Sequence, residues 1–228
     1  MTKLTTADLD ALTQWDTPTI CNALEITNPE RRGFGYNVKP LTSLDPSLPP
    51  MIGYARTAKI RAAAPATVAA DRLEYYEYVA TGPRPTIVVI EDVDPSPGYG
   101  AFWGEVQTNV HKGLGAKGCV TNGCFRDVTD SAPGFQLLGG MVNPSHAHVH
   151  LIEINCPVNV HGIEVAHGDI IHADLHGAVV VPEDAVKRIP DAVDLLIRRE
   201  AVILKAARAP DFNFEKLKVA IGTQADIH

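Results

Sequence analysis

The feature that most constrains the fold is a strand–helix–strand pattern in the middle of the chain. Residues 86–91 (TIVVIE) form a short β-branched run without polar alternation, which is typical of a strand buried on both faces. Residues 101–114 place apolar side chains at helical spacing, and residues 118–121 (GCVT) predict a second short strand. Segments of this kind form a βαβ unit, whose strands are parallel and adjacent or close together. We therefore expect a mixed α/β fold.

The flanking segments extend this unit. Residues 142–181 alternate or run apolar between glycine-containing turns, which predicts a β-rich second half. The remaining expected elements are helices from Thr6 and after Pro18, a surface connection over 39–50, a strand over 56–62, a helix over 66–79, and a helical region from Pro182 that Pro190 kinks or restarts. We expect one domain over 1–228, with an N-terminal helical segment and Pro-rich connection (1–50) and C-terminal helices (183–228).

Charge and segment composition exclude several classes of protein. The chain has 20 Lys and Arg against 27 Asp and Glu, a net charge of −7, whereas proteins that bind nucleic acid phosphates usually carry a basic excess. No apolar stretch is long enough to span a membrane, and the N-terminus lacks the apolar segment of a signal peptide. The four cysteines form no CxxC pair. We expect a cytoplasmic protein with no nucleic-acid partner and no membrane segment.

Two loops follow the carboxyl ends of the predicted strands, which is where open α/β sheets bind ligands. Gly104 lies near the first turn of the helix and lets an anion approach amide groups that have no helical partner. In the second loop, Arg126 can form paired hydrogen bonds with a carboxylate or keto oxygen, and Asp127 offers a hard oxygen ligand for magnesium. The alternative interpretation is a structural ion pair between Arg126 and Asp127 that caps a short helix.

The spacing of these residues resembles a known family. Gly104-Glu105, twenty further residues and Arg126-Asp127-x-x-Asp130 resemble the signature of the divalent-metal pyruvate aldolases, which share a fold with the regulator of ribonuclease activity A (RraA-like) family. The resemblance extends from about residue 17 to 182. It implies a layered β/β/α swivelling-domain-like fold. It also implies a class II aldolase that cleaves 4-hydroxy-4-methyl-2-oxoglutarate or 4-carboxy-4-hydroxy-2-oxoadipate to pyruvate through a metal-stabilised enolate, with oxaloacetate decarboxylase side activity.

The resemblance also implies roles for individual residues. The backbone of Gly104, Glu105, Val106 and Gln107 would bind the pyruvate carboxylate. Arg126 would hold the keto or carboxylate oxygens, and Asp127 would ligate Mg²⁺ or Mn²⁺. Family members typically carry Asp where this chain has Glu105, and the longer side chain shifts the carboxylate that positions a catalytic water. Glu200 is the match for an acidic residue that a neighbouring subunit contributes.

Partners and alternatives follow from the same resemblance. The expected ligand is a small-molecule keto acid, and the expected assembly is a homotrimer or a homohexamer with sites near subunit interfaces. A second hypothesis is a non-catalytic regulator that binds an RNA-degrading endonuclease; the presence of Asp127, which such a regulator does not need, favours catalysis. A third hypothesis keeps the metal site for a different keto acid, or for decarboxylation alone.

A run of histidines, His146-x-His148-x-His150, has the spacing of a metal site on one face of a strand. The nearest carboxylate, Glu153, would point to the opposite face of such a strand, and the surrounding sequence is rich in histidine. We therefore expect a structural or interface role for the run.

Overall fold

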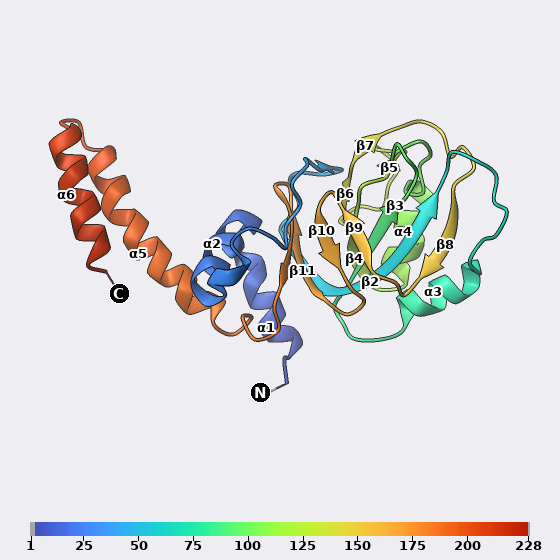
Figure 1. Ribbon diagram of the computed structural model, residues 1–228, viewed down its shortest axis with the longest axis horizontal. Coiled ribbons are helices and arrows are strands. Elements are labelled where there is room, and N and C mark those ends of the chain that lie inside the picture. Colours follow the sequence, from blue (N-terminus) through green and yellow to red (C-terminus); the bar gives the residue numbers. More distant parts are fainter. Residues whose placement is uncertain (1–2, 228) are drawn as a thin grey trace.

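The computed structural model describes residues 3–227 and shows a curled sheet with helices on one face and at one end (Figure 1). The helices, with the short 3₁₀ turns η1 and η2, are α1 (Thr6–Asp10), η1 (Ala11–Gln14), α2 (Thr17–Thr27), η2 (Pro29–Arg31), α3 (Arg72–Ala80), α4 (Glu105–Gly113), α5 (Ile189–Ala207) and α6 (Phe214–Ala225). Side-chain caps begin several of them: Asp16 accepts from the Thr19 amide at α2, and Asp71 accepts from two amides at α3.

The main sheet has eight strands in the order β1-β6-β4-β3-β2-β11-β12, with β8 also paired to β2. Its strands are β1 (Thr42–Ser43), β2 (Met51–Arg61), β3 (Thr86–Asp92), β4 (Ala116–Thr121), β6 (Gln136–Gly139), β8 (His150–Ile154), β11 (Ile170–Asp174) and β12 (Gly177–Val181). The four central strands β2, β3, β4 and β6 are parallel, and the outer pairings are antiparallel. The predicted βαβ unit is therefore confirmed as β3-α4-β4, with its two strands adjacent.

Two further pairs complete the strands. They are the antiparallel hairpin of β9 (Val158–Val160) and β10 (Ile163–Val165), and the parallel pair of β5 (Cys124–Phe125) and β7 (Met141–Val142). The hairpin packs on one face of the main sheet, where its valines share a core with Ile87 and Val89 of β3. Val88 and Ile90 point to the other face and pack with residues of α3 and with Trp103. The protein is thus layered as hairpin, sheet and helices, which confirms the expected β/β/α arrangement.

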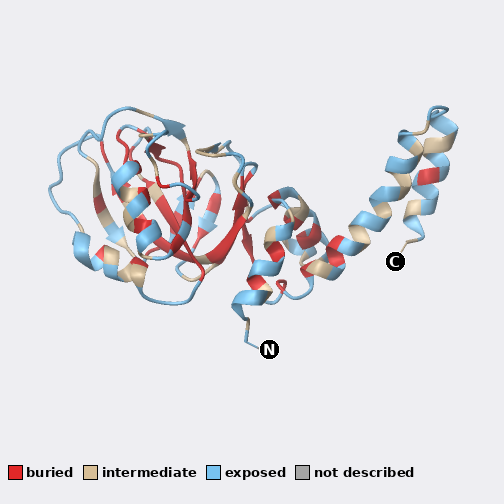
Figure 2. Ribbon diagram, turned by 180° about the vertical axis from the view of Figure 1, so that it is seen from behind, coloured by how far each residue is buried: buried red, intermediate tan, exposed pale blue. Residues whose placement is uncertain are grey.

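A third core joins the N-terminal helices and the start of α5 to the β11–β12 edge of the sheet, through Leu9, Ile20 and Val193 among others. Beyond this contact α5 extends away from the sheet, and α6 folds back against it, so that the two helices form a projecting α5–α6 hairpin (Figure 1). Figure 2 shows that buried residues concentrate in the sheet, while the α5–α6 hairpin is mostly exposed. Among residues 3–227, no helix is long and apolar enough to cross a membrane.

Two helix boundaries differ from the sequence prediction. The helix expected over 66–79 begins only at Arg72, because the side chain of Asp71 caps it there and the preceding residues form a loop. The helix expected over 101–114 begins at Glu105, because Trp103 forms a β-bridge with Phe125 and holds the residues before Gly104 extended. Pro190 lies in the first turn of α5, so it starts that helix instead of kinking it.

Candidate functional site

The two predicted loops meet at the carboxyl end of the central strands, where hydrogen bonds of the Asn122 side chain hold them together. The Asn122 side chain accepts from the Asp92 amide at 2.7 Å and donates to the Asp92 carbonyl at 2.9 Å. This amide clamp continues the β3–β4 pairing past the last strand residues. It fixes the point from which both loops depart.

The Asp92 carboxylate shapes the first loop. One oxygen accepts from the Asp94 amide at 3.0 Å, and the other accepts from the Gly98 amide at 2.7 Å. Burial raises the pKa of this carboxyl, and the two amide hydrogen bonds oppose the increase. The buried Asp92 carboxylate therefore stabilises the turn of the loop that leads to α4. The sequence pattern did not predict this role.

The second loop is aligned with the first by backbone contacts. Trp103 and Phe125 form a parallel bridge, and the Arg126 amide donates to the Trp103 carbonyl at 3.0 Å. Thr108 of α4 reaches across as well, since its hydroxyl accepts from the Ala132 amide at 2.9 Å. Gly104 and residues 126–127 are consequently held side by side at the start of α4.

Asp127 is the residue on which these contacts converge. Its backbone has φ of 52°, a left-handed conformation that Asp tolerates better than most residues. Its Oδ2 accepts from the Glu105 amide at 3.2 Å and lies 3.4 Å from Nε of Arg126. The ion pair that the alternative interpretation predicted is therefore present, and it caps α4. Both side chains stay about one third exposed, so the pair also faces solvent.

The first turn of α4 keeps donors free beside this pair. Gly104 is the N-cap residue and has no side chain, so it cannot cap the turn itself. The first amides of a helix have no acceptor within it, which leaves those of Val106 and Gln107 available to an anion. The Glu105 side chain is exposed and makes no hydrogen bond or ion pair within residues 3–227. The structure thus brings Gly104 through Gln107, Arg126 and Asp127 together.

A divalent cation fits the donor set at Asp127 on chemical grounds. The second carboxylate oxygen of Asp127 has no hydrogen-bond partner among the described residues. Within that part of the chain, no three His, Cys, Asp or Glu side chains are grouped to enclose a metal. Mg²⁺ usually retains several waters and binds through one or two carboxylates together with its substrate. One open carboxylate is a donor set that suits this mode and does not suit a closed zinc site.

Gly104 leaves no room for a larger residue beside this carboxylate. A Cβ at position 104 would lie 2.5 Å from Oδ2 of Asp127. We expect Gly104→Ala to displace the carboxylate and lower any metal-dependent turnover by about 10- to 100-fold, because small displacements of catalytic groups carry costs of that size. Gly113→Ala in the same helix is the matched control, since nothing lies within 4 Å of its added Cβ. Equal turnover in both variants would contradict the placement of Asp127.

The fully buried side chain of His111 connects α4 to α3 and to Trp103. His111 Nε2 lies 2.7 Å from the Tyr75 hydroxyl of α3, and its Nδ1 lies 2.7 Å from the Gln107 carbonyl. Its ring packs against Trp103 at a centroid distance of 4.6 Å. Burial lowers the pKa of His111 to about 4, so the imidazole is neutral at physiological pH.

This pKa shift predicts a pH dependence of stability. Between pH 6.5 and 4, His111 takes up a proton in the unfolded chain but not in the folded one, so stability is lost as the pH falls through that range. The shift corresponds to about 3 kcal/mol. We expect urea titrations to show that the wild-type protein loses unfolding free energy between pH 7 and pH 4. In His111→Gln the same change of pH should cost less, by about 3 kcal/mol. An equal loss in both proteins would refute the shift.

The structure places other predicted residues apart from this site. Glu200 is an exposed residue of α5, and α5 and α4 lie at opposite sides of the molecule (Figure 1). Of the histidine run, only His150 lies in a strand; His146 and His148 precede it in a turn where Ala147 has φ of 47°. The turn breaks the alternation, so the three rings do not share one strand face and the metal-site alternative loses its geometry; the structural or interface role expected for the run stays a prediction.

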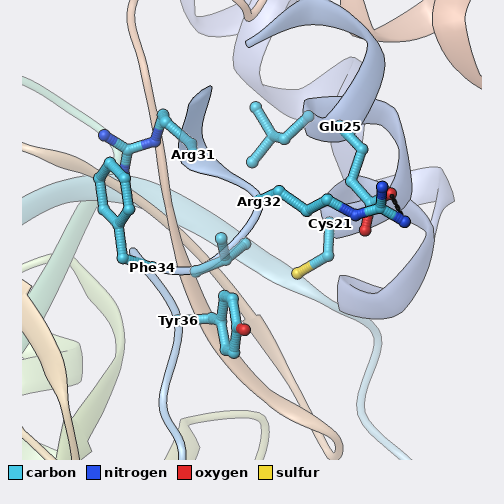
Figure 3. A pocket seen from close by; sticks show the side chains of 8 residues that line it. Cys21, Glu25, Arg31, Arg32, Phe34 and Tyr36 are labelled. Atoms are coloured by element: carbon cyan, nitrogen blue, oxygen red, sulfur yellow. Dashed lines mark ion pairs between the residues drawn. The ribbon is translucent and has the colours of Figure 1, made fainter. Parts of the chain in front are cut away.

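A separate small cavity of about 160 Å³ lies between α2 and β12, with Cys21 on its wall (Figure 3). Arg32 pairs with Glu25 at 3.1 Å beside it, and Arg31 stacks on Phe34. Burial raises the pKa of the Cys21 thiol to about 11. A thiol of that pKa is protonated at neutral pH, so Cys21 is a poor nucleophile.

Comparisons with known proteins agree with this architecture. The family model described as RraA-like, Aldolase/RraA, matches residues 17–180. The uncharacterized protein MJ0644 of Methanocaldococcus jannaschii is 35% identical over 104 residues, which are 45% of this chain and 50% of that protein. The chain therefore matches about half the length of this curated relative.

Solved structures share the fold. An uncharacterized protein from Pseudomonas syringae has a TM-score of 0.72 and 22% identity over 97% of this chain and 96% of its own. Streptomyces coelicolor RraAS2, described as an unusual member of the RNase ES inhibitor RraA protein family, has a TM-score of 0.68 and 21% identity over 88% of this chain and 96% of its own. The family model spans the central strands and the loops that carry Arg126 and Asp127, and the chain belongs to the RraA-like (Aldolase/RraA) family.

Proposed function

We propose that the protein is a divalent-metal-dependent carbon–carbon lyase that releases pyruvate from a 4-hydroxy-2-keto acid, and that it also decarboxylates oxaloacetate. The observation that carries the proposal is the convergence of Arg126, Asp127 and the free amides of α4 on one solvent-facing spot. An arginine, an open carboxylate and an anion-binding helix start are the groups that a chelating keto acid needs.

In this proposal each group of residues has a separate role in binding or in the reaction. The amides of Val106 and Gln107 bind the carboxylate of the keto acid. Arg126 donates hydrogen bonds to the keto oxygen and stabilises the negative charge that develops there as the C3–C4 bond breaks. Through a water, the exposed Glu105 carboxylate accepts the proton of the C4 hydroxyl, and C4 leaves as the carbonyl carbon of the second product while the C3–C4 electron pair passes to C3. The same water then returns the proton from Glu105 to C3 to give pyruvate.

Asp127 would hold Mg²⁺ or Mn²⁺, and the bound ion would supply a Lewis acid for the keto oxygen. The Glu105 amide and the Arg126 side chain orient the Asp127 carboxylate from one side. The other carboxylate oxygen has no hydrogen-bond partner among the described residues and would be available to the ion.

Assembly is part of the same proposal. Glu200 belongs to α5, which lies on the opposite side of the molecule from α4 (Figure 1), so in this proposal it would serve the site of a neighbouring copy in a homotrimer or homohexamer. Exposed apolar side chains support such contacts: Val106 and Val128 flank the site at 63% and 47% exposure, and Phe214 of α6 is 73% exposed. An interface that covers them would remove apolar surface from water.

Pyruvate release tests the proposal. The protein would be incubated with 4-hydroxy-4-methyl-2-oxoglutarate and with oxaloacetate, each with Mg²⁺ and with a chelator, and lactate dehydrogenase would report pyruvate. Chelator-sensitive release above the rate without protein is expected for both substrates. No release from either substrate by folded protein with added metal would refute the proposal.

A regulator of an RNA-degrading endonuclease is the second candidate, because the similar structure of RraAS2 is described as belonging to a family of RNase ES inhibitors. Binding alone does not need a metal ligand at position 127. Inhibition of such an endonuclease that persists in Asp127→Asn, without pyruvate release by the wild-type protein, would favour this candidate.

A further inference from the structure

A cavity of about 740 Å³ opens beside the first turn of α4 and has a lining of unusual charge. Its polar lining residues are Arg72, Tyr76, Gln107, His146, His148 and His150, and its remaining lining residues are apolar. None of the lining residues is Asp or Glu, although the whole chain carries a net charge of −7. A pocket lined by an arginine and three histidines favours an anion.

Arg72 has no competing acid. In residues 3–227 no carboxylate lies within ion-pair distance of its guanidinium, which is stacked over the Tyr76 ring at 5.6 Å and donates from Nε to the Tyr76 hydroxyl at 3.2 Å. These contacts use one edge of the guanidinium. The Nη groups remain available to form paired hydrogen bonds with a carboxylate.

The histidines of the opposite wall are held by local contacts. His148 is tied through its backbone amide to the Ala62 carbonyl at 3.0 Å, and no hydrogen bond of its ring occurs within the described part of the chain. His146 Nδ1 lies 3.3 Å from the Ala101 carbonyl, and His150 Nδ1 lies 2.7 Å from the His148 carbonyl. Within residues 3–227 the His148 ring has no protein partner, so one of its nitrogens can donate to an anion. In the neutral His146 and His150 rings, Nδ1 donates to these carbonyls and Nε2 is left as an acceptor, so these two rings are polar wall and not anion donors.

The cavity is joined to the candidate active site through Gln107. The Tyr76 hydroxyl donates to Gln107 Oε1 at 3.0 Å, and both residues line the cavity. Gln107 and Val106 also belong to the first turn of α4, whose Glu105 amide contacts Asp127. The candidate site and the cavity therefore share the first turn of α4, which contacts Asp127 through the Glu105 amide and lines the cavity through Val106 and Gln107.

We infer that this cavity binds the distal carboxylate of a dicarboxylic keto acid, with Arg72 as the residue that determines specificity for it and the histidine run as a polar wall. The inference rests on the proposed function for the position of the keto-acid end. It gives His148 a role in anion binding. It also predicts that keto acids without a second carboxylate bind poorly.

A binding experiment tests the inference without turnover. Calorimetric titration of the full-length protein would compare glutarate with pentanoate, which has the same chain length and lacks one carboxylate. We expect glutarate to bind at least tenfold more tightly, because hydrogen bonds between charged groups have energies of that size. Arg72→Gln should abolish the preference, and Arg208→Gln, at the exposed end of α5, should retain it. Circular dichroism would establish that both variants fold.

The outcomes separate this inference from the proposed function. Equal affinity for the two acids in the wild-type protein, or an intact preference in Arg72→Gln, would overturn the inference whether or not pyruvate is released. If Arg72→Gln loses the preference for glutarate and Arg208→Gln keeps it, the inference is supported even when the protein releases no pyruvate. With 4-hydroxy-4-methyl-2-oxoglutarate as substrate, Arg72→Gln should raise KM about tenfold with kcat within about threefold, because Arg72 does not contact the reacting atoms.

Discussion

Replacing Asp127 by asparagine is expected to reduce chelator-sensitive pyruvate release by about a thousand-fold. The amide oxygen of Asn can still accept from the Glu105 amide, and Asn tolerates the left-handed backbone at this position, so the cap on α4 survives. What is lost is the negative charge that binds the cation. A metal ion contributes several kcal/mol to stabilising charge, and about 4 kcal/mol corresponds to three orders of magnitude in rate.

Asp127→Ala serves as the companion variant because it removes both the charge and the cap. It should lose turnover as completely as Asp127→Asn and should also lose about 1 kcal/mol of unfolding free energy, the usual cost of a missing helix cap. Rates would be measured with saturating Mg²⁺, and stabilities by urea titration. Turnover within tenfold of the wild-type rate in Asp127→Asn would show that Asp127 only caps the helix.

Arg126→Lys is expected to lower kcat/KM by about 100- to 1000-fold, the range found when one donor to a developing oxyanion is removed. The guanidinium uses Nε to contact Asp127 and keeps its Nη groups for the substrate. A lysine ammonium provides a single point charge and cannot make both sets of contacts from one position.

The matched control is Arg32→Lys, which makes the same exchange in an exposed ion pair with Glu25. That pair is at the protein surface, so its loss should leave both turnover and stability nearly unchanged. Steady-state kinetics of the two variants would be compared at one metal concentration. Near-normal kcat/KM in Arg126→Lys would remove Arg126 from the substrate-binding group.

The central part of the fold was predictable because its signal is local. Side chains of β3 contribute alternately to two cores, which requires apolar residues at successive positions, and residues 87–90 (IVVI) supply that run. The helix that follows was also predictable, but its start was not. Phe102 fits the helical spacing of Val106 and Val110. The bridge from Trp103 to Phe125, a contact across more than twenty residues, holds this segment extended instead.

The candidate site was predictable in its residues and not in its supports. Motif spacing places Arg126 and Asp127 near Gly104, whereas the clamp of Asn122 on Asp92 joins residues thirty apart and leaves no periodic trace in the sequence. The cavity at Arg72 was missed for the same reason: its walls come from α3, α4, β8 and the segments that precede each of them. Sequence patterns report local geometry, and such enclosures depend on tertiary packing.

The amide clamp, the Trp103–Phe125 bridge and the Thr108 contact all fall between Asp92 and Ala132. The candidate site is thus assembled by one continuous stretch of chain. The neighbouring cavity shares Phe102, Val106 and Gln107 with that stretch, while Arg72 and the histidine run come from α3 and from the segment that leads into β8. The residues proposed to select the substrate are therefore separate in the chain from Arg126 and Asp127. A chimaera that exchanges only residues 63–76 and 145–151 between relatives should exchange their substrate preference and keep the bond-breaking step of the recipient.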